Sequence, residues 1–322
     1  MNEWKEISLH DIKGVKIGRA QSEPHATGCT VILPDKKAVC GVDVRGGGPA
    51  SRENQLLNPL MSNDGVNAVL LSGGSAYGLD AAGGVMKYLE ERGRGVKVGS
   101  NVVPIVVGSC IFDLGCVDGS VRPDAKMGYK ACEDAERNLE RNGNVGAGMG
   151  ATVGKLLGND RSMKSGLGCY AVQVGSLQVG AIVSVNAIGD VYEMDSGREL
   201  AGLLSKDKTA MISSEVEAVK LLQLASKFSL NTTIGCIITN AGLDKAEMNK
   251  VAAMASNGVA RTIRPVNTSM DGDSVYAISV GKVKSCADVV GTLAAHVMAK
   301  AINRAVLETK PMYGYLSAQS FL

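Results

Sequence analysis

Apolar runs of strand length alternate along this chain with longer segments in which apolar residues recur at helical spacing. Residues 28–33 and 38–44 are two strand-like runs, and the polar turn 34–37 between them predicts a hairpin. Residues 166–175 and 178–185 predict a second hairpin. Helical spacing predicts helices at 76–92, 123–141, 215–227, 243–263 and 287–307. The pattern is typical of an ordinary globular chain.

One passage from a polar loop into an apolar strand has an unusual composition. Thr232 and Thr233 follow Asn231 directly and occupy the first positions of a strand-like run that continues to Thr239. A loop that enters a buried strand usually carries glycine, proline or aspartate, and does not need paired β-branched hydroxyls. Two interpretations follow. The threonines only open the strand, or the Asn231-Thr232 peptide bond is a site of self-cleavage.

The self-cleavage interpretation has a chemical basis. A threonine inside a chain is a weak nucleophile because its hydroxyl needs a nearby base to take the proton. A threonine freed at an N-terminus carries that base itself, since the α-amino group has a pKa of roughly 7.7–8.0 and is partly neutral at cellular pH. Cleavage before Thr232 would therefore create the catalytic group.

Composition and charge exclude several classes of function. The 34 basic and 32 acidic residues leave a net charge of +2, which provides no electrostatic footprint for nucleic acid or a membrane surface. No run of about 18 apolar residues occurs and the N-terminus lacks a signal segment, so we expect neither membrane insertion nor secretion. The eight cysteines form no Cys-x-x-Cys pair, which is typical of reduced thiols in a cytoplasmic protein. The histidines lack metal-ligand spacing, and we expect no metal site.

The glycine-rich segment 145–156 is similar to two nucleotide-binding motifs and satisfies neither. A Walker loop needs four residues between its glycine and the Gly-Lys pair, and then a hydroxyl. Here three residues separate Gly150 from Gly154, and Leu156 follows Lys155. A dinucleotide fingerprint should follow a strand, but a predicted helix precedes this segment. We therefore expect no cofactor.

Three polar residues beside predicted strands are candidates for a functional site. Asn186 lies where the second hairpin ends; such an amide is usually a turn residue, but it can also stabilise an oxyanion. Asp271 and Asp273 precede the apolar run 275–280. They could form a solvated turn. Residues two apart in an extended segment face the same side, so both carboxylates could instead serve one site.

Ser75 precedes the predicted helix 76–92, and we interpret it as the N-cap of that helix. A hydrolase nucleophile at this position would require the elbow Gly-x-Ser-x-Gly, which needs glycine where Tyr77 stands.

Six motifs in order carry a resemblance to one enzyme family. They are the segments Gly41–Gly47, Ser72–Asp80, Gly148–Lys155, Val185–Asp190, Asn231–Gly235 and Asp271-Gly272-Asp273. With these motifs the chain resembles the self-processing L-aminopeptidase/D-esterase family, which includes the β-aminopeptidases and the 6-aminohexanoate-oligomer hydrolases. The match runs from about residue 11 to the C-terminal helix.

The resemblance implies an α+β fold, a four-layer αββα sandwich of the N-terminal-nucleophile style with ornithine-acetyltransferase-like connectivity. It implies one hydrolase domain over residues 1–322, with autocleavage between Asn231 and Thr232 into an α chain, residues 1–231, and a β chain, residues 232–322. Both chains would stay packed, because the nucleophile's strand belongs to a shared sheet. The family also suggests a homo-oligomer, tetrameric or larger.

The resemblance also implies a role for each candidate residue. Thr232 would be the nucleophile, and Lys155 would assist it. Asn186 would stabilise the oxyanion, and Asp271 with Asp273 would orient the threonine. The implied substrate is a small peptide or amide with a free amino terminus, which includes short peptides, β-amino acid amides and ω-amino acid oligomers.

Two departures from the family pattern bear on the identity of the substrate. They are Val107–Cys110 and Asn267, which we expect near the substrate pocket. Tyr77 and Phe112 are candidates for the lining of that pocket, with plain core positions as the alternative. Two other functions stay open: an acyltransferase of the ornithine acetyltransferase type, whose Ala-Thr-Met-Leu cleavage element is missing here, and a non-catalytic binding protein on the same fold.

Overall fold

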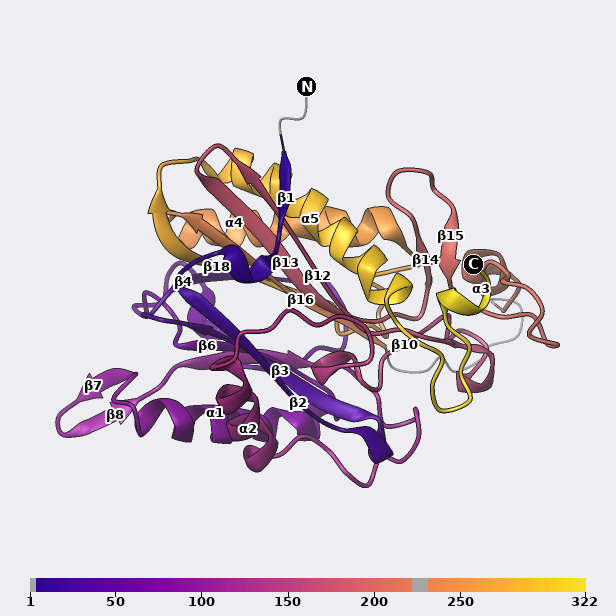
Figure 1. The fold of residues 1–322 in the computed structure, drawn as a ribbon, viewed down its shortest axis with the longest axis horizontal. Coiled ribbons are helices and arrows are strands. Elements are labelled where there is room, and N and C mark those ends of the chain that lie inside the picture. The colour runs from indigo at the N-terminus through magenta and orange to yellow at the C-terminus, as the bar shows by residue number, and fades with distance from the viewer. Residues whose placement is uncertain (1–3, 222–230) are drawn as a thin grey trace.

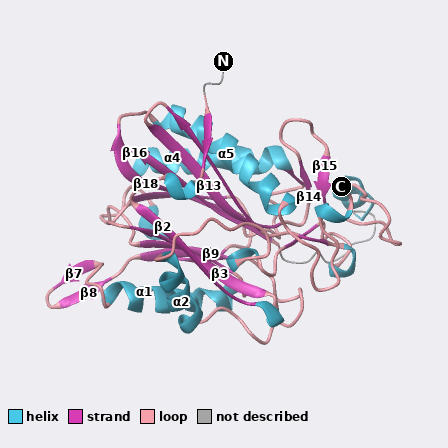
Figure 2. Ribbon diagram, viewed as in Figure 1, coloured by secondary structure: helices cyan, strands magenta, loops and turns pink. Residues whose placement is uncertain are grey.

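Most strands of the chain belong to a six-stranded and a five-stranded β-sheet (Figures 1 and 2). The computed structural model describes residues 4–221 and 231–322. The six-stranded sheet has the order β1 (Lys5–Ile7), β12 (Leu167–Val174), β13 (Leu177–Asn186), β16 (Thr232–Ala241), β18 (Ser274–Val283), β4 (Val39–Val44). The five-stranded sheet has the order β2 (Val15–Ser22), β3 (Thr27–Pro34), β6 (Ala68–Ser72), β9 (Val106–Cys110), β5 (Ala50–Arg52).

Each of these sheets is covered by a pair of helices. The helices α4 (Lys245–Thr262) and α5 (Ala287–Leu307) pack on each other and on the six-stranded sheet. The helices α1 (Ala81–Glu90) and α2 (Ala125–Ala135) pack on each other and on the five-stranded sheet. In Figure 1 the two pairs lie on opposite sides of the molecule. The mixed α+β class expected from the sequence is therefore present.

Short elements form the remaining connections. They are the strand pairs β7 (Val96–Val98) with β8 (Asn101–Val103) and β10 (Thr152–Val153) with β11 (Met163–Lys164), a small sheet of β15 (Glu199–Ala201), β14 (Asp190–Tyr192) and β17 (Ile263–Arg264), and the helix α3 (Ser214–Leu221). Turns of 3₁₀ helix occur at Leu9–Asp11, Glu23–His25, Asn54–Leu57, Ser75–Asp80, Gly146–Gly148, Asn159–Arg161 and Ala318–Ser320.

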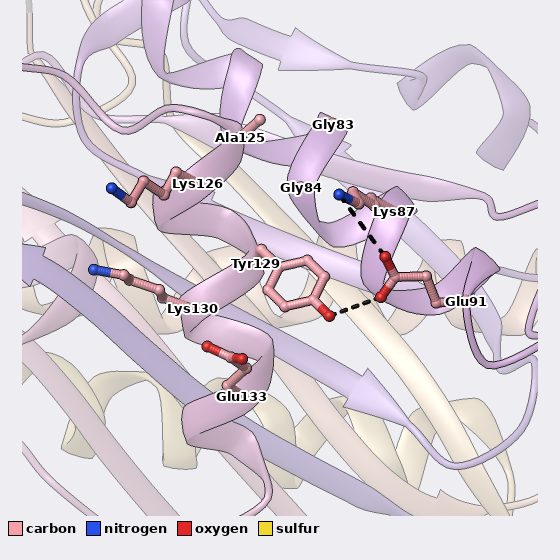
Figure 3. A pocket seen from close by; sticks show the side chains of 9 residues that line it. All are labelled: Gly83, Gly84, Lys87, Glu91, Ala125, Lys126, Tyr129, Lys130 and Glu133. Carbon is pink, nitrogen blue, oxygen red and sulfur yellow. Dashed lines mark hydrogen bonds and ion pairs between the residues drawn. The ribbon is translucent and has the colours of Figure 1, made fainter.

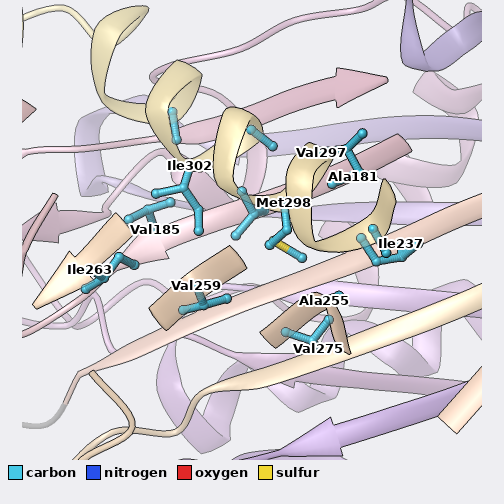
Figure 4. Close-up of a cluster of buried hydrophobic side chains, with 14 of the residues drawn as sticks. Ala181, Val185, Ile237, Ala255, Val259, Ile263, Val275, Val297, Met298 and Ile302 are labelled. Atoms are coloured by element: carbon cyan, nitrogen blue, oxygen red, sulfur yellow. The ribbon is translucent and has the colours of Figure 1, made fainter. Parts of the chain in front are cut away.

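Buried apolar side chains form three main clusters. The first joins α4 and α5 to the six-stranded sheet, with Met298 and Ile302 of α5 close to Val259 of α4 and Ile237 of β16 (Figure 4). The second contains residues of both large sheets, and the third joins the five-stranded sheet to α1 and α2. Burial of one such side chain contributes about 1.5–3 kcal/mol. These clusters hold the central strands, and with them the start of β16, in place.

The first predicted hairpin is wrong, and the second is confirmed. Residues 28–33 belong to β3, which pairs with β2 and β6, whereas residues 38–44 contain β4, which pairs with β18 in the other sheet. Every residue of β3 is buried, and an unbroken apolar run does not specify which strand will be its partner. The second hairpin is β12 with β13, which pair from Leu167 opposite Ser184 to Val174 opposite Leu177.

The predicted helices at 243–263 and 287–307 are confirmed as α4 and α5. The helix predicted at 123–141 is shorter, because α2 ends at Ala135 and Asn138 adopts a positive φ of 46°. The Asn138 side chain accepts a hydrogen bond from the Ile17 N–H at 3.0 Å, a tertiary contact that no local pattern could indicate. The helix predicted at 215–227 begins within α3, and its residues 222–227 lie outside the described residues.

The interpretation of Ser75 as an N-cap is wrong. Residues Ser75–Asp80 form a 3₁₀ turn, α1 begins only at Ala81, and Ser75 itself has a φ of 53°. Its N–H donates to the carbonyl of Ile111 at 2.9 Å. The chain therefore turns tightly over the end of β9 before the helix starts.

Candidate active site

Strand pairing places Asn186 and Thr232 side by side. Strand β13 ends at Asn186, β16 begins at Thr232, and the antiparallel register pairs these two residues. Strand β16 also runs parallel to β18, with Ile234 opposite Ser274. The Asp-Gly-Asp motif directly precedes β18, so it lies against the start of β16. The candidate site therefore lies at one end of three adjacent strands in the six-stranded sheet.

Two described residues donate hydrogen bonds to the carbonyl oxygen of Asn231. Thr232 Oγ1 donates to it over a short contact, and the backbone N–H of Gly272 donates to it at 2.9 Å. The Asn231 N–H donates to the carbonyl of Met270 at 3.3 Å, and Asn231 forms a parallel bridge with Asp271. Asn231 and Thr232 are 1% and 4% exposed. The hydroxyl of Thr232 thus lies beside the peptide group that the sequence singled out, shielded from bulk water.

The two carboxylates of the Asp-Gly-Asp motif bind backbone N–H groups around this peptide group. Asp273 Oδ1 accepts a hydrogen bond from the Thr233 N–H at 2.5 Å, and its Oδ2 accepts one from the Asn267 N–H at 3.0 Å. Asp271 Oδ2 accepts a hydrogen bond from the Thr268 N–H at 2.7 Å. No donor among residues 4–221 and 231–322 meets Asp271 Oδ1, which is buried. Asn267, one of the departures from the family pattern, is therefore in contact with the site.

The segment after β4 holds the Asp-Gly-Asp motif from its other side. The Gly48 N–H donates to the Asp271 carbonyl at 2.8 Å, and the N–H groups of Arg45 and Gly46 donate to the Asp273 carbonyl at 3.1 and 3.3 Å. A Cβ atom on Gly46 would lie 2.3 Å from the Asp271 carbonyl oxygen, so this close approach requires glycine. The first and last motifs of the family resemblance are thus in direct contact.

Lys155 is a buried amine beside the carboxylates. Its Nζ donates to the backbone carbonyl of Asn186 at 2.8 Å, and the residue is 3% exposed. Burial lowers the pKa of Lys155 from 10.5 to about 7, although the nearby Asp271 above all opposes this shift. Burial also raises the pKa of Asp271, and burial together with the charge of Asp271 raises the pKa of Asp273. Amine and carboxyl groups are thus both displaced toward neutrality, which is common at catalytic sites.

The side-chain amide of Asn186 is held in one orientation. Its Nδ2 donates to the Phe112 carbonyl at 3.0 Å, and its Oδ1 accepts a hydrogen bond from the Thr152 N–H at 3.1 Å. Phe112, Thr152 and Lys155 also line a cavity of about 40 Å³. The other residues of its lining are Asp113, Gly115, Cys116, Gly150 and Asn159. Phe112 therefore lies at the site, as does Lys155 from the glycine-rich segment.

Asp113 is a buried carboxylate of this cavity that the sequence analysis missed. It is 5% exposed, and its two oxygens accept hydrogen bonds from Thr27 Oγ1 and from the Gly74 N–H, both at 2.7 Å. Burial raises the pKa of Asp113 to about 6. The available signal was an acidic residue three positions after β9, in a stretch that is otherwise apolar.

Tyr77 and the departure at Val107–Cys110 lie in different surroundings. Tyr77 is 60% exposed, and the guanidinium of Arg122 lies 4.0 Å from its ring centroid. It does not line the small cavity, and its part in a substrate pocket stays a prediction. Val107–Cys110 belongs to the buried strand β9, where Ser109 Oγ and the Tyr276 hydroxyl share a hydrogen bond of 2.7 Å.

A wider cavity of about 420 Å³ lies elsewhere, between α1 and α2 (Figure 3). The Tyr129 hydroxyl donates a hydrogen bond to the Glu91 carboxylate at 2.7 Å, and Lys87 forms an ion pair with Glu91 at 3.8 Å. Exposed ion pairs of this kind contribute little to stability. No candidate residue of the site lines this cavity.

Two features are absent from the described part of the chain. No group of three or more His, Cys, Asp or Glu side chains there could hold a metal ion. No described helix is both long and apolar enough to cross a membrane.

Comparison with known proteins identifies the family. The model of peptidase family S58 matches residues 8–319. A Mycobacterium leprae protein described as an uncharacterized aminopeptidase is 40% identical over 339 residues, covering 95% of this chain and 92% of that protein. The 6-aminohexanoate-oligomer endohydrolase of Kocuria sp. is 29% identical over 318 residues, covering 92% of this chain and 85% of its own.

A solved structure supports the same fold. The L-aminopeptidase D-Ala-esterase/amidase of Ochrobactrum anthropi, described as a new variant of the Ntn hydrolase fold, superposes with a TM-score of 0.68. The sequences are 17% identical, and the match covers 94% of this chain and 86% of that one, so the likeness concerns the fold alone. With the family model and the relatives, the resemblance predicted from six motifs is confirmed: the chain belongs to peptidase family S58, with L-aminopeptidase/D-esterase, β-aminopeptidase and 6-aminohexanoate-oligomer hydrolase homologues.

Proposed function

We propose that this chain is a self-processing hydrolase whose nucleophile is Thr232. It cuts its own Asn231-Thr232 bond, which leaves an α chain of residues 1–231 and a β chain of residues 232–322, and then hydrolyses amide bonds. The observation that carries the proposal is the hydrogen bond from Thr232 Oγ1 to the Asn231 carbonyl, in a buried cluster with Lys155 and two carboxylates.

Self-cleavage would proceed through an ester. Thr232 Oγ1 attacks the Asn231 carbonyl carbon, the C–N bond breaks, and the hydroxyl proton passes to the departing nitrogen. Water then hydrolyses the ester, which leaves a carboxylate on Asn231 and restores the hydroxyl of Thr232. Lys155 is suited to relay the proton, because its low pKa leaves a fraction of the amine neutral near pH 7.

In turnover the freed α-amine of Thr232 would take the proton from its own hydroxyl and pass it to the leaving group. Asp271 Oδ1 meets no donor among the described residues, so it is available to hold this new ammonium group. Asp273 holds the backbone of the neighbouring Thr233 and keeps the nucleophile in place. Asn186 would stabilise the oxyanion of the substrate.

The proposed substrate is a small peptide or amide with a free amino terminus. The relatives, one described as an aminopeptidase and one as a 6-aminohexanoate-oligomer endohydrolase, support short peptides, β-amino acid amides and ω-amino acid oligomers as the classes to test. We include in the proposal a cytoplasmic homo-oligomer that needs no cofactor. We also include the four-layer αββα arrangement with ornithine-acetyltransferase-like connectivity, which the three apolar clusters support.

The test is the denatured mass of freshly purified protein, with N-terminal sequencing of any smaller fragment. We expect two chains, the smaller of which begins Thr-Thr-Ile-Gly, and a single chain of 33.4 kDa for Thr232→Ala. Thr233→Ala is the matched control and should still be cut. A Thr232→Ala protein that splits at this site would refute the assignment and make Thr233 the candidate. Incubation of the processed enzyme with amino-acid amides, with and without an acyl acceptor, separates hydrolysis from acyl transfer.

A further inference from the structure

We propose that the backbone N–H of Gly272 is the oxyanion donor of the self-cleavage step, and that the side-chain amide of Asn186 is not. This inference rests on the proposed self-cleavage between Asn231 and Thr232. It means that processing and turnover use two different donors in one site. It also assigns a catalytic role to the central glycine of the Asp-Gly-Asp motif.

The Gly272 N–H already binds the atom on which negative charge would develop. It donates to the Asn231 carbonyl oxygen at 2.9 Å, the distance at which an oxyanion donor acts. Thr232 Oγ1, the attacking group itself, also donates to that oxygen. Once Thr232 Oγ1 bonds to the carbonyl carbon, its proton no longer binds the carbonyl oxygen. The Gly272 N–H is the described donor to the carbonyl oxygen that stays in place.

The peptide group that carries this N–H is fixed at both ends. Its carbonyl, on Asp271, accepts a hydrogen bond from the Gly48 N–H at 2.8 Å, while its N–H faces Asn231. A hydrogen bond on the carbonyl side of a peptide polarises the N–H and strengthens its donation. The parallel bridge between Asn231 and Asp271 fixes the two segments further. The donor is therefore organised before the reaction begins, which makes electrostatic stabilisation effective.

The amide of Asn186 is engaged with other groups. Its Nδ2 donates to the carbonyl of Phe112 at 3.0 Å, and its Oδ1 is held by the Thr152 N–H. Its own backbone carbonyl accepts the hydrogen bond of Lys155 Nζ. In the uncleaved chain both ends of the side-chain amide are thus engaged with groups other than the Asn231 carbonyl, and its donor is bound to Phe112, on the wall of the small cavity.

The close approach of neighbouring atoms requires glycine at position 272. A Cβ atom there would lie 2.8 Å from Thr232 Oγ1 and 3.0 Å from the Gly48 carbonyl oxygen. An alanine would thus crowd the nucleophile but keep the N–H. Gly272→Ala therefore cannot test the contribution of the hydrogen-bond donor by itself. A better perturbation removes the N–H and adds no atom beside the nucleophile.

The step balances without any further reactant except water. The bond from Thr232 Oγ1 to the Asn231 carbonyl carbon forms, and the carbonyl π pair moves onto oxygen, where the Gly272 N–H stabilises it. Collapse breaks the C–N bond, and the hydroxyl proton goes to the Thr232 nitrogen. Water adds its hydroxyl to the Asn231 carbonyl and its hydrogen to Thr232 Oγ1.

The experiment replaces Gly272 by glycolate in the full chain, by cell-free translation, so that an ester oxygen takes the place of the N–H. Removal of one oxyanion donor lowers a rate by about 10²–10³-fold, and we expect this loss in the rate of self-cleavage. The matched control is glycolate at Gly197, an exposed residue whose N–H donates to the Glu193 carbonyl at 2.9 Å. Mass spectrometry distinguishes cleavage before Thr232 from hydrolysis of the introduced ester, which would cut before residue 272.

A second variant tests the other half of the inference. We expect Asn186→Ala to cleave itself at a rate within a few-fold of the natural chain, and to lose turnover of an amino-acid amide after processing. Glycolate at 272 that cleaves as fast as glycolate at 197 would overturn the inference, and so would an Asn186→Ala chain that is folded by circular dichroism but stays intact. Failure of the natural chain to cleave before Thr232 would instead overturn the proposed function.

Discussion

Lys155 offers a test of the site that does not depend on any substrate. The change is Lys155→Met, made in the Thr232→Ala background so that a single intact chain can be unfolded. Burial holds the pKa of Lys155 at about 7, against 10.5 for an exposed lysine. Between these two values the unfolded chain binds a proton that the folded chain lacks. Folding must release that proton, and its release costs less free energy as the pH rises, so the folded state gains stability.

The two pKa values define the magnitude. The unfavourable contribution of Lys155 to folding is about 4 kcal/mol near pH 7 and about 2 kcal/mol near pH 9, because one pKa unit corresponds to about 1.4 kcal/mol. Relative to Lys155→Met, the parent should therefore gain about 2 kcal/mol over this interval. The carboxyls act in the same direction. Without the lysine the already raised pKa values of Asp271 and Asp273 rise further. A folded chain that keeps these carboxyls protonated loses stability as the pH increases, so Lys155→Met should lose more stability than the parent.

The assay is urea unfolding followed by circular dichroism near pH 7 and near pH 9, on the parent and the variant. Lys130→Met, which removes an exposed lysine from α2, is the control for loss of a lysine as such. A difference in unfolding free energy between the parent and Lys155→Met that is the same at both pH values would refute the reasoning. It would mean that Lys155 keeps its proton in the folded chain and cannot act as a neutral amine.

Two further predictions concern the frame around the site. Met298→Ala should lower the unfolding free energy of the Thr232→Ala chain by about 2–5 kcal/mol, because the Met298 side chain is fully buried against β16. Urea unfolding measures this change. The control is Val289→Ala, at a half-exposed position of the same helix, which should change the unfolding free energy by about 0.5 kcal/mol or less. The processed chains should co-elute on native size exclusion although they separate on a denaturing gel, and a free chain of residues 232–322 under native conditions would contradict the shared sheet.

The sequence indicated more of the candidate site than of the strand pairing. Thr232, Asn186 and the Asp-Gly-Asp motif were candidates from the residues themselves, Lys155 was a candidate only from the family resemblance, and the structure brings these residues together. The Gly272 N–H could not be predicted in this way. Every residue except proline has such a group, and only its contact with the Asn231 carbonyl, distant in sequence, suggests a role for it. Asp113 was missed because a single acidic residue carries no motif.

Two of the errors in the fold have one physical cause. Local patterns indicated that residues 28–33 and 38–44 are strands, and both are, but they belong to different sheets. Pairing depends on contacts between segments far apart in sequence, such as β4 with β18, which no spacing within a short window reveals. The early end of α2 has the same origin, because the Asn138 side chain that follows it is bound by Ile17, more than a hundred residues away.

The position of β16 explains how a cut in the chain can be compatible with an intact site. Thr232 is the first residue of β16, so cleavage before it removes no hydrogen bond of the strand's own ladders. Strand β16 pairs with β13 over eight residue pairs, and β18 pairs with β4 over six. Strands β13 and β4 would belong to the α chain, and β16 and β18 to the β chain. Two full ladders and the cluster under α4 and α5 would therefore bind the chains together, and the new amine would emerge where Asn186, Lys155 and Asp271 already lie.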